Sequence, residues 1–184
     1  LGDNHFNCPV VAYYPQTILN NTTRVNDIKF IHDFIGIHNP KIFNQKIHEL
    51  LKKYFKGIKK SEIEKASAAA FNEYDSYLKA IRSEANEYIK FARENNQQIV
   101  VLSGRPYHVD PEVNHGIDNL ITSLGATVIS EESISHLVDK FNVGVLNQWT
   151  YHSRLYAAAR YCTTQEDMNL VQLVSFGCGL DAVT

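Results

Sequence analysis

Residues 99–129, IVVLSGRPYHVDPEVNHGIDNLITSLGATVI, hold the succession of elements that decides the fold. The first four residues are a continuous apolar run, typical of a strand that is buried on both faces. Asp110 followed by Pro111 predicts a helix start, and Gly125 predicts the end of that helix. Residues 126–129 are again apolar and predict the next strand. A strand–helix–strand unit of this kind joins parallel strands, so the sequence predicts a parallel sheet.

The same alternation continues toward the C-terminus. Residues 149–161 predict a helix and residues 170–174 predict another strand. The expected fold class is therefore α/β, with an open, mostly parallel sheet and flanking helices of the Rossmann or flavodoxin type. Ligands of such sheets bind beyond the carboxyl ends of the strands. The loop after residue 102 and the glycine-rich loop after residue 174 should therefore lie on one rim.

The N-terminal segment carries weaker patterns. Residues 9–14 suit a short strand, although the prolines at positions 9 and 15 suit an extended loop equally well. Residues 27–31 predict a second strand. Asn39 followed by Pro40 predicts the start of a helix that continues to about residue 55.

One long amphipathic helix is predicted from Ser61, which forms a capping box with Glu64, to about residue 94. It would span roughly 50 Å at about 1.5 Å per residue, longer than a compact domain usually carries. We therefore expect one α/β domain, residues 1–184, in which residues 39–95 form a helical insertion or subdomain. We also expect this domain to be part of a larger polypeptide.

The composition is that of an ordinary globular chain. It has 184 residues, of which 44% are hydrophobic and 21% are charged, enough for one sizeable core or two small ones. The net charge of -2 offers no basic surface for nucleic acid, and no apolar run approaches the ~18 residues of a membrane-spanning helix. Three cysteines without a recognisable signal peptide favour a reducing compartment. We predict a cytoplasmic protein that binds neither nucleic acid nor membrane.

The loop after the first strand of the βαβ unit is rich in groups that bind anions. Gly104 allows close approach of a ligand, and an arginine, a tyrosine and histidines supply charge and hydrogen-bond donors. The candidate anion- or substrate-binding residues are Arg105, Tyr107, His108, Asn114 and His115. A structural alternative stays open, in which Arg105 pairs with Asp110 or Glu112 while the histidines cap and pack. Residues 149–154 could also bind an aromatic or anionic group, but the start of a buried helix explains them more simply.

The stretch at residues 175–181, SFGCGLD, sets Cys178 between two glycines directly after an apolar run. Glycines at these positions let the chain turn sharply and present the thiol, with its neighbouring N–H groups, to a ligand. Such a turn suits a metal cluster or an anion. A buried free cysteine in a strand-to-helix turn is the open alternative.

Four stretches of the chain carry a resemblance to a known family. They are FNCPVVAYYP (residues 6–15), VLSGRPYHVDPEVNHGIDNLI (101–121), QWTYHSRLYAAARY (148–161) and VSFGCGLDAV (174–183). Together they resemble the 2-hydroxyglutaryl-CoA dehydratase-related region of large acyl-CoA dehydratase activase-related proteins. The resemblance implies an iron–sulfur protein that receives single electrons from an ATP-hydrolysing activator, with that activator and an acyl-CoA as its partners. It also implies that the longer protein is an acyl-CoA dehydratase or reductase.

The resemblance further implies which cysteines hold the cluster. Cys8 and Cys178 match the family's candidate ligands for an iron–sulfur cluster of the 4Fe-4S kind, whereas Cys162 falls where the family has no fixed cysteine and is interpreted as structural. Two thiolates are too few for a cluster, so the chain by itself should carry none and should be inactive. The alternative function is a non-catalytic docking or electron-relay domain. No glycine-rich loop ending in Lys-Ser or Lys-Thr occurs, so ATP hydrolysis is not expected of this chain.

Overall fold

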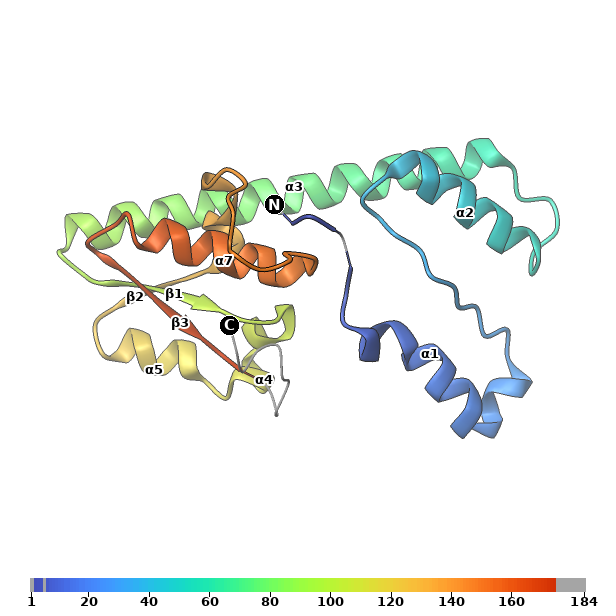
Figure 1. Ribbon diagram of the computed structural model, residues 1–184, viewed down its shortest axis with the longest axis horizontal. Coiled ribbons are helices and arrows are strands. Elements are labelled where there is room, and N and C mark those ends of the chain that lie inside the picture. Colours follow the sequence, from blue (N-terminus) through green and yellow to red (C-terminus); the bar gives the residue numbers. More distant parts are fainter. Residues whose placement is uncertain (1, 5, 175–184) are drawn as a thin grey trace. The chain divides into compact units, whose positions relative to one another are not determined.

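The computed structural model describes residues 2–4 and 6–174 of the chain (Figure 1). The chain divides into two compact units, Leu1–Asn4 with Tyr77–Thr184 and His5–Ser76. The division falls inside the longest helix, α3 (Lys60–Glu94), which has 35 residues. The predicted subdomain at residues 39–95 stays a prediction.

The sheet has three parallel strands in the order β2-β1-β3. They are β1 (Ile99–Ser103), β2 (Thr127–Ser130) and β3 (Met168–Gln172). The central strand, β1, pairs in parallel with both neighbours, so that Val101 lies beside Ile129 on one side and beside Leu170 on the other. The predicted open, parallel α/β sheet is confirmed, with strand bounds shifted by one or two residues.

Helices cover both faces of this sheet (Figure 1). The C-terminal half of α3 and α7 (Thr150–Cys162) pack on one face, and α5 (Ile117–Ser123) lies on the other. Small residues let α3 and α7 approach the strands closely. The buried cluster between these helices and the sheet comprises Ala85, Ile89, Ala92, Ile99, Val101, Ile129, Ile134, Ala158, Cys162 and Met168.

The connection from β1 to β2 contains more turns than the sequence predicts. It consists of η2 (Pro106–Val109), α4 (Pro111–Asn114) and α5. The expected cap is confirmed, since the Asp110 side chain accepts the Glu112 N–H at 2.9 Å. The expected single helix is wrong. His115 and Gly116 both have a left-handed backbone, with φ values of 54° and 77°, and this geometry interrupts a right-handed helix.

After β2 the chain forms α6 (Glu131–Ile134) and η3 (Ser135–Leu137). An irregular segment then leads to α7, and both short helices pack against α7. This connection brings the carboxyl end of β2 next to the start of α7.

The strand or extended loop considered for residues 9–14, and the strand predicted at residues 27–31, are both wrong. Residues 9–14 belong to α1 (Pro9–Asn21), which begins with a proline at its first position, where the ring fits a helix and no N–H is needed. The backbone after η1 (Thr23–Asp27) is extended at Ile28, but no strand in the described part of the chain pairs with it. Valines and isoleucines favour a strand only where a sheet is available to receive them.

The two helices predicted between residues 39 and 95 are confirmed. In α2 (Pro40–Lys52), the Asn39 side chain accepts the N–H groups of Lys41 and Ile42. Helix α3 starts one residue before the predicted Ser61, and its first turn is capped differently, because the Glu62 carboxylate accepts the Lys59 N–H at 2.8 Å. None of the helices in the described ranges has the length and apolarity needed to cross a bilayer.

Candidate functional site

The strand order changes direction at the central strand, β1. The chain adds β2 on one side of β1 and later adds β3 on the other side, so β1 and β3 form a topological switch point. Open α/β sheets bind ligands outside the carboxyl ends of strands at such a point. The two strand ends are tied together here, since Leu173 donates its N–H to the Ser103 carbonyl at 2.8 Å.

Gly104, directly after β1, is packed too closely for any side chain. A Cβ at this position would overlap His108 Nδ1 and would lie 3.0 Å from the Leu173 carbonyl oxygen. The preceding Ser103 is 1% exposed, and its hydroxyl has no hydrogen-bond partner among the described residues. The carboxyl end of β1 is therefore a tightly packed turn with a buried hydroxyl beside it.

His108 holds this turn in place. The ring is buried, and Nδ1 accepts the backbone N–H of Arg105 at 2.9 Å. Because Nδ1 accepts, the neutral ring carries its proton on Nε2. The Tyr107 ring meets it edge-on, with centroids 4.7 Å apart. His108 thus fixes the backbone from which Arg105, a half-buried residue, extends its side chain.

Asn114 and His115 shape the next turn of the chain, between α4 and α5. Asn114 is 2% exposed, and its side-chain oxygen accepts the Gly116 N–H at 2.8 Å. His115 is exposed and left-handed. Helix α4, which ends at Asn114, packs against η2, so these residues lie near the loop that contains His108. Their part in ligand binding stays a prediction.

A partly buried ionic cluster lies at the carboxyl end of β2. Arg154 of α7 donates to Glu131 at 2.6 Å and to Glu132 at 2.7 Å. Burial raises the pKa of the Glu131 carboxyl, against the opposing effect of Arg154. Burial also disfavours the charged guanidinium, but the two carboxylates outweigh it and the pKa of Arg154 is raised. Since two carboxylates already occupy its guanidinium, Arg154 is not an open anion-binding group.

Sequence reasoning missed this cluster. The available signal was a pair of glutamates directly after a predicted strand, at the rim where ligands bind. Their partner comes from a helix 22 and 23 residues further along the chain, so no local pattern connects them.

The three cysteines are placed differently. Cys8 is half-buried and directly precedes α1, and Cys178 lies outside the described residues. Cys162 is 7% exposed within the core cluster, and burial raises the pKa of its thiol. The expectation that Cys162 is a packing residue is confirmed. Whether Cys8 and Cys178 share a cluster stays a prediction.

The described residues by themselves do not fit a metal cluster. Within residues 2–4 and 6–174, no three side chains of the types His, Cys, Asp and Glu are gathered so that they could hold a metal ion. An iron–sulfur cluster is usually held by four thiolates. The described part of the chain offers one half-buried thiol, Cys8, and one buried in the core, Cys162.

Comparison with known proteins identifies the family. Residues 1–134 match the model of the CoA enzyme activase uncharacterised domain. The chain belongs to this family. The match includes Cys8, the rim loop of Gly104 and Arg105, and the glutamates after β2, whereas α7 and β3 follow it in the sequence. Searches of curated proteins and of solved structures gave no match. The activase-related part of the resemblance is confirmed, and the link to 2-hydroxyglutaryl-CoA dehydratases stays a prediction.

Proposed function

We propose that this CoA enzyme activase-related domain binds the anionic groups of an acyl-CoA at the β1/β3 switch point. One observation carries the proposal. Arg105 follows the tightly packed Gly104 at the carboxyl end of the central strand, and its backbone is fixed by His108. A guanidinium binds phosphate or carboxylate in a bidentate manner, and a rigid backbone lowers the entropy lost on binding.

Neighbouring groups would complete the anion site. Tyr107 is 44% exposed and can donate a hydrogen bond from its hydroxyl, and His108 carries a proton on Nε2 when neutral. Asn114 and His115 are further candidates from the following turn. The description of the family as CoA enzyme-related supports a CoA thioester over an unrelated anion.

Isothermal titration with CoA tests this proposal. We expect Arg105→Gln to weaken CoA binding about tenfold or more, because it removes charge-assisted hydrogen bonds. Arg160→Gln is the matched control, since Arg160 is exposed in the last turn of α7 and should leave binding unchanged. Equal affinity of wild type and Arg105→Gln for CoA would remove the rim from the site.

We further propose that Cys8 and Cys178 ligate an iron–sulfur cluster in a longer polypeptide that contains this chain. In this proposal, an ATP-hydrolysing activator supplies single electrons to a 2-hydroxyacyl-CoA dehydratase or reductase in the reducing cytoplasm. The chain of residues 1–184 alone should purify without iron, because two thiolates do not complete a cluster. In the longer polypeptide, prepared anaerobically, Cys8→Ala and Cys178→Ala should lower iron and sulfide content, and Cys162→Ala should not. Loss of iron in Cys162→Ala alone would reverse this assignment.

A docking or electron-relay domain is the second candidate. Helix α1 favours it, because none of its residues is buried and Val10, Val11 and Tyr14 are all at least half exposed. Absence of CoA binding by the wild-type chain, together with binding of the activator, would favour this second candidate.

A further inference from the structure

The outer side of β2 carries backbone groups that pair with no strand in the described part of the chain. In the order β2-β1-β3, β2 is an edge strand. Thr127 donates its N–H to the Gln98 carbonyl at 2.9 Å, so the backbone groups of Thr127 face β1. Successive residues of a strand point these groups to opposite sides. The N–H and C=O of Val128 therefore face away from the sheet, where an additional strand could pair with them.

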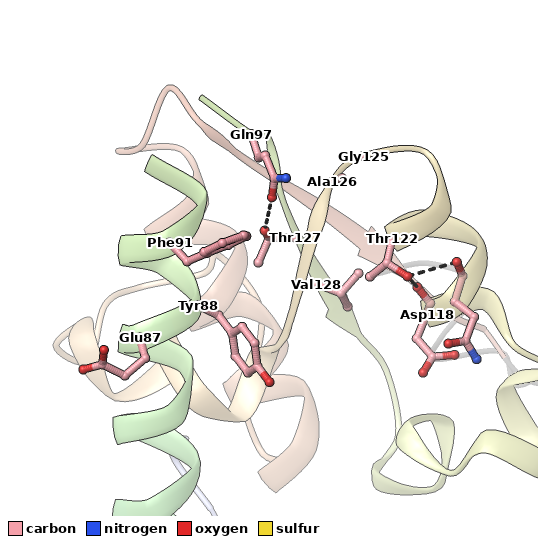
Figure 2. A pocket seen from close by; sticks show the side chains of 11 residues that line it. Glu87, Tyr88, Phe91, Gln97, Asp118, Thr122, Gly125, Ala126, Thr127 and Val128 are labelled. Carbon is pink, nitrogen blue, oxygen red and sulfur yellow. Dashed lines mark hydrogen bonds between the residues drawn. The ribbon is translucent and has the colours of Figure 1, made fainter. Parts of the chain in front are cut away.

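A groove runs along this edge. Two cavities of about 810 Å³ and about 490 Å³ share Val128 and Tyr88 in their linings. Figure 2 shows the larger one, with Tyr88 and Phe91 of α3 on one side of β2 and Thr122 of α5 on the other. Helices on both faces of the sheet thus extend past β2 and leave its edge at the bottom of a groove, all within the unit that contains Tyr77–Thr184.

The charged side chains that line the groove are all acidic. They are Glu84, Glu87 and Asp118, and no lysine or arginine of residues 2–4 and 6–174 lines either cavity. Oδ1 of Asp118 is buried without a hydrogen-bond partner among the described residues. An occupant that carries lysine or arginine would neutralise these carboxylates and satisfy the buried oxygen.

We propose that the β2 edge binds an extended segment of a partner protein, which pairs with Val128 as a fourth strand. Its side chains alternate between the aromatic wall of α3 and the α5 side, which suits β-branched residues, and it carries lysine or arginine at its ends. A second copy of the chain is a poorer occupant, because pairing two β2 edges would bring the acidic residues of both copies together. The proposed surface uses none of the rim residues and is independent of CoA binding.

Fluorescence anisotropy with labelled peptides tests the proposal. We expect the wild-type chain to bind the peptide KVTVTVK. The affinity for EVTVTVE should be lower by at least about tenfold, because its glutamates are repelled by the three carboxylates that attract the lysines of KVTVTVK. KVTPTVK should not bind, because proline removes a backbone donor and breaks strand pairing. Equal binding of the three peptides would overturn the proposal.

Variants of the chain separate strand pairing from charge. Val128→Pro removes an N–H that faces away from β1, so the fold should persist by circular dichroism while KVTVTVK binding is lost. Glu87→Lys should weaken binding severalfold, whereas Glu73→Lys, an exposed control on α3 outside both linings, should not. Unchanged binding in Val128→Pro and Glu87→Lys would overturn the proposal. So would concentration-dependent dimerisation of the wild type that Val128→Pro abolishes, because a second copy would then occupy the edge.

Discussion

Position 104 has room for a hydrogen atom and for nothing larger. The His108 ring and the Leu173 carbonyl already occupy the space into which a side chain would extend. The Leu173 contact lies between the loop after β1 and the end of β3. Glycine at position 104 therefore lets the two strand ends of the switch point approach each other closely. Packing, and not an unusual backbone angle, requires glycine here.

Gly104→Ala should destabilise the fold by about 1–3 kcal/mol, because the methyl group must displace a buried ring and a backbone carbonyl. Urea denaturation measures this change. Gly36→Ala is the control, since its Cβ would meet only the exposed His38 ring, which can move, and the cost should stay within about 0.5 kcal/mol. A Gly104→Ala variant as stable as wild type would show that His108 is not held against this turn.

Glu131 gives stability a dependence on pH. Because burial raises its pKa in the folded state, the folded chain binds a proton more readily than the unfolded chain. Stability from this group is present below its ordinary pKa of 4.5 and is lost as pH rises through the raised value. Relative to Glu131→Gln, the wild type should therefore lose unfolding free energy as pH rises from near 4.5. Urea denaturation across this pH range measures the difference.

Asp167 provides a control of opposite sign. The hydrogen bond from Arg93 lowers the pKa of Asp167 below its ordinary 3.8. Its contribution is therefore present above that value and is lost as pH falls through the lowered pKa. Relative to Asp167→Asn, the wild type should lose stability on acidification. A wild type that gains stability over Glu131→Gln as pH rises would mean that Arg154 dominates burial at Glu131.

At the scale of elements, short sequence patterns correctly predicted the helices and strands that are decided by neighbouring residues. The apolar run at β1, the Asp110 cap and the long amphipathic α3 are all visible in short windows of sequence. Neither the strand nor the extended loop considered for residues 9–14 is correct, because valine and tyrosine form strands only beside a partner strand, and Pro9 suits a helix start. Tertiary context decided this case.

The candidate site divides in the same way. The rim loop with Arg105 and His108 follows a predicted strand, so topology alone placed it at the carboxyl edge. The partly buried hydrogen bond from the Arg105 N–H to His108, and the pairing of Arg154 with Glu131, depend on how the chain packs. Sequence patterns do not contain that information.

The break between α4 and α5 depends on two successive residues with left-handed backbone, His115 and Gly116. Substitutions at these two positions should therefore change the free energy of unfolding in opposite directions. His115→Gly should stabilise the chain by up to about 1 kcal/mol, because a non-glycine residue at φ 54° is strained. Gly116→Ala should destabilise it by about 1–2 kcal/mol at φ 77°. Thermal and urea unfolding of both variants measure the effect. Stabilisation by Gly116→Ala would indicate one continuous helix from Pro111 to the residue before Gly125, as the sequence alone predicts.

At the scale of the whole molecule, the apolar core is divided unevenly between the two units. Among the described residues, thirteen buried hydrophobic side chains belong to the unit with Tyr77–Thr184, and three, Val25, Leu50 and Ile63, belong to His5–Ser76. Burial of apolar area is the main stabilising contribution to a fold. The first unit therefore has a core able to stabilise its sheet, whereas the second relies on helices with few buried contacts.

Native-state hydrogen exchange should reveal this difference. The amides of β1 lie in the central strand, in which the side chains of Ile99 and Val101 have no exposed area. They should therefore exchange only when the unit unfolds. Amides of α1, which has no buried residue, should exchange faster by about 100-fold or more after correction for intrinsic rates. Amides of α3 near Ala92 are the internal control for a helix packed on the sheet and should be protected like β1. Strong protection of α1 at every protein concentration would contradict an unburied helix. Protection that grows with concentration would instead show that the exposed Val10 and Tyr14 become covered when chains associate.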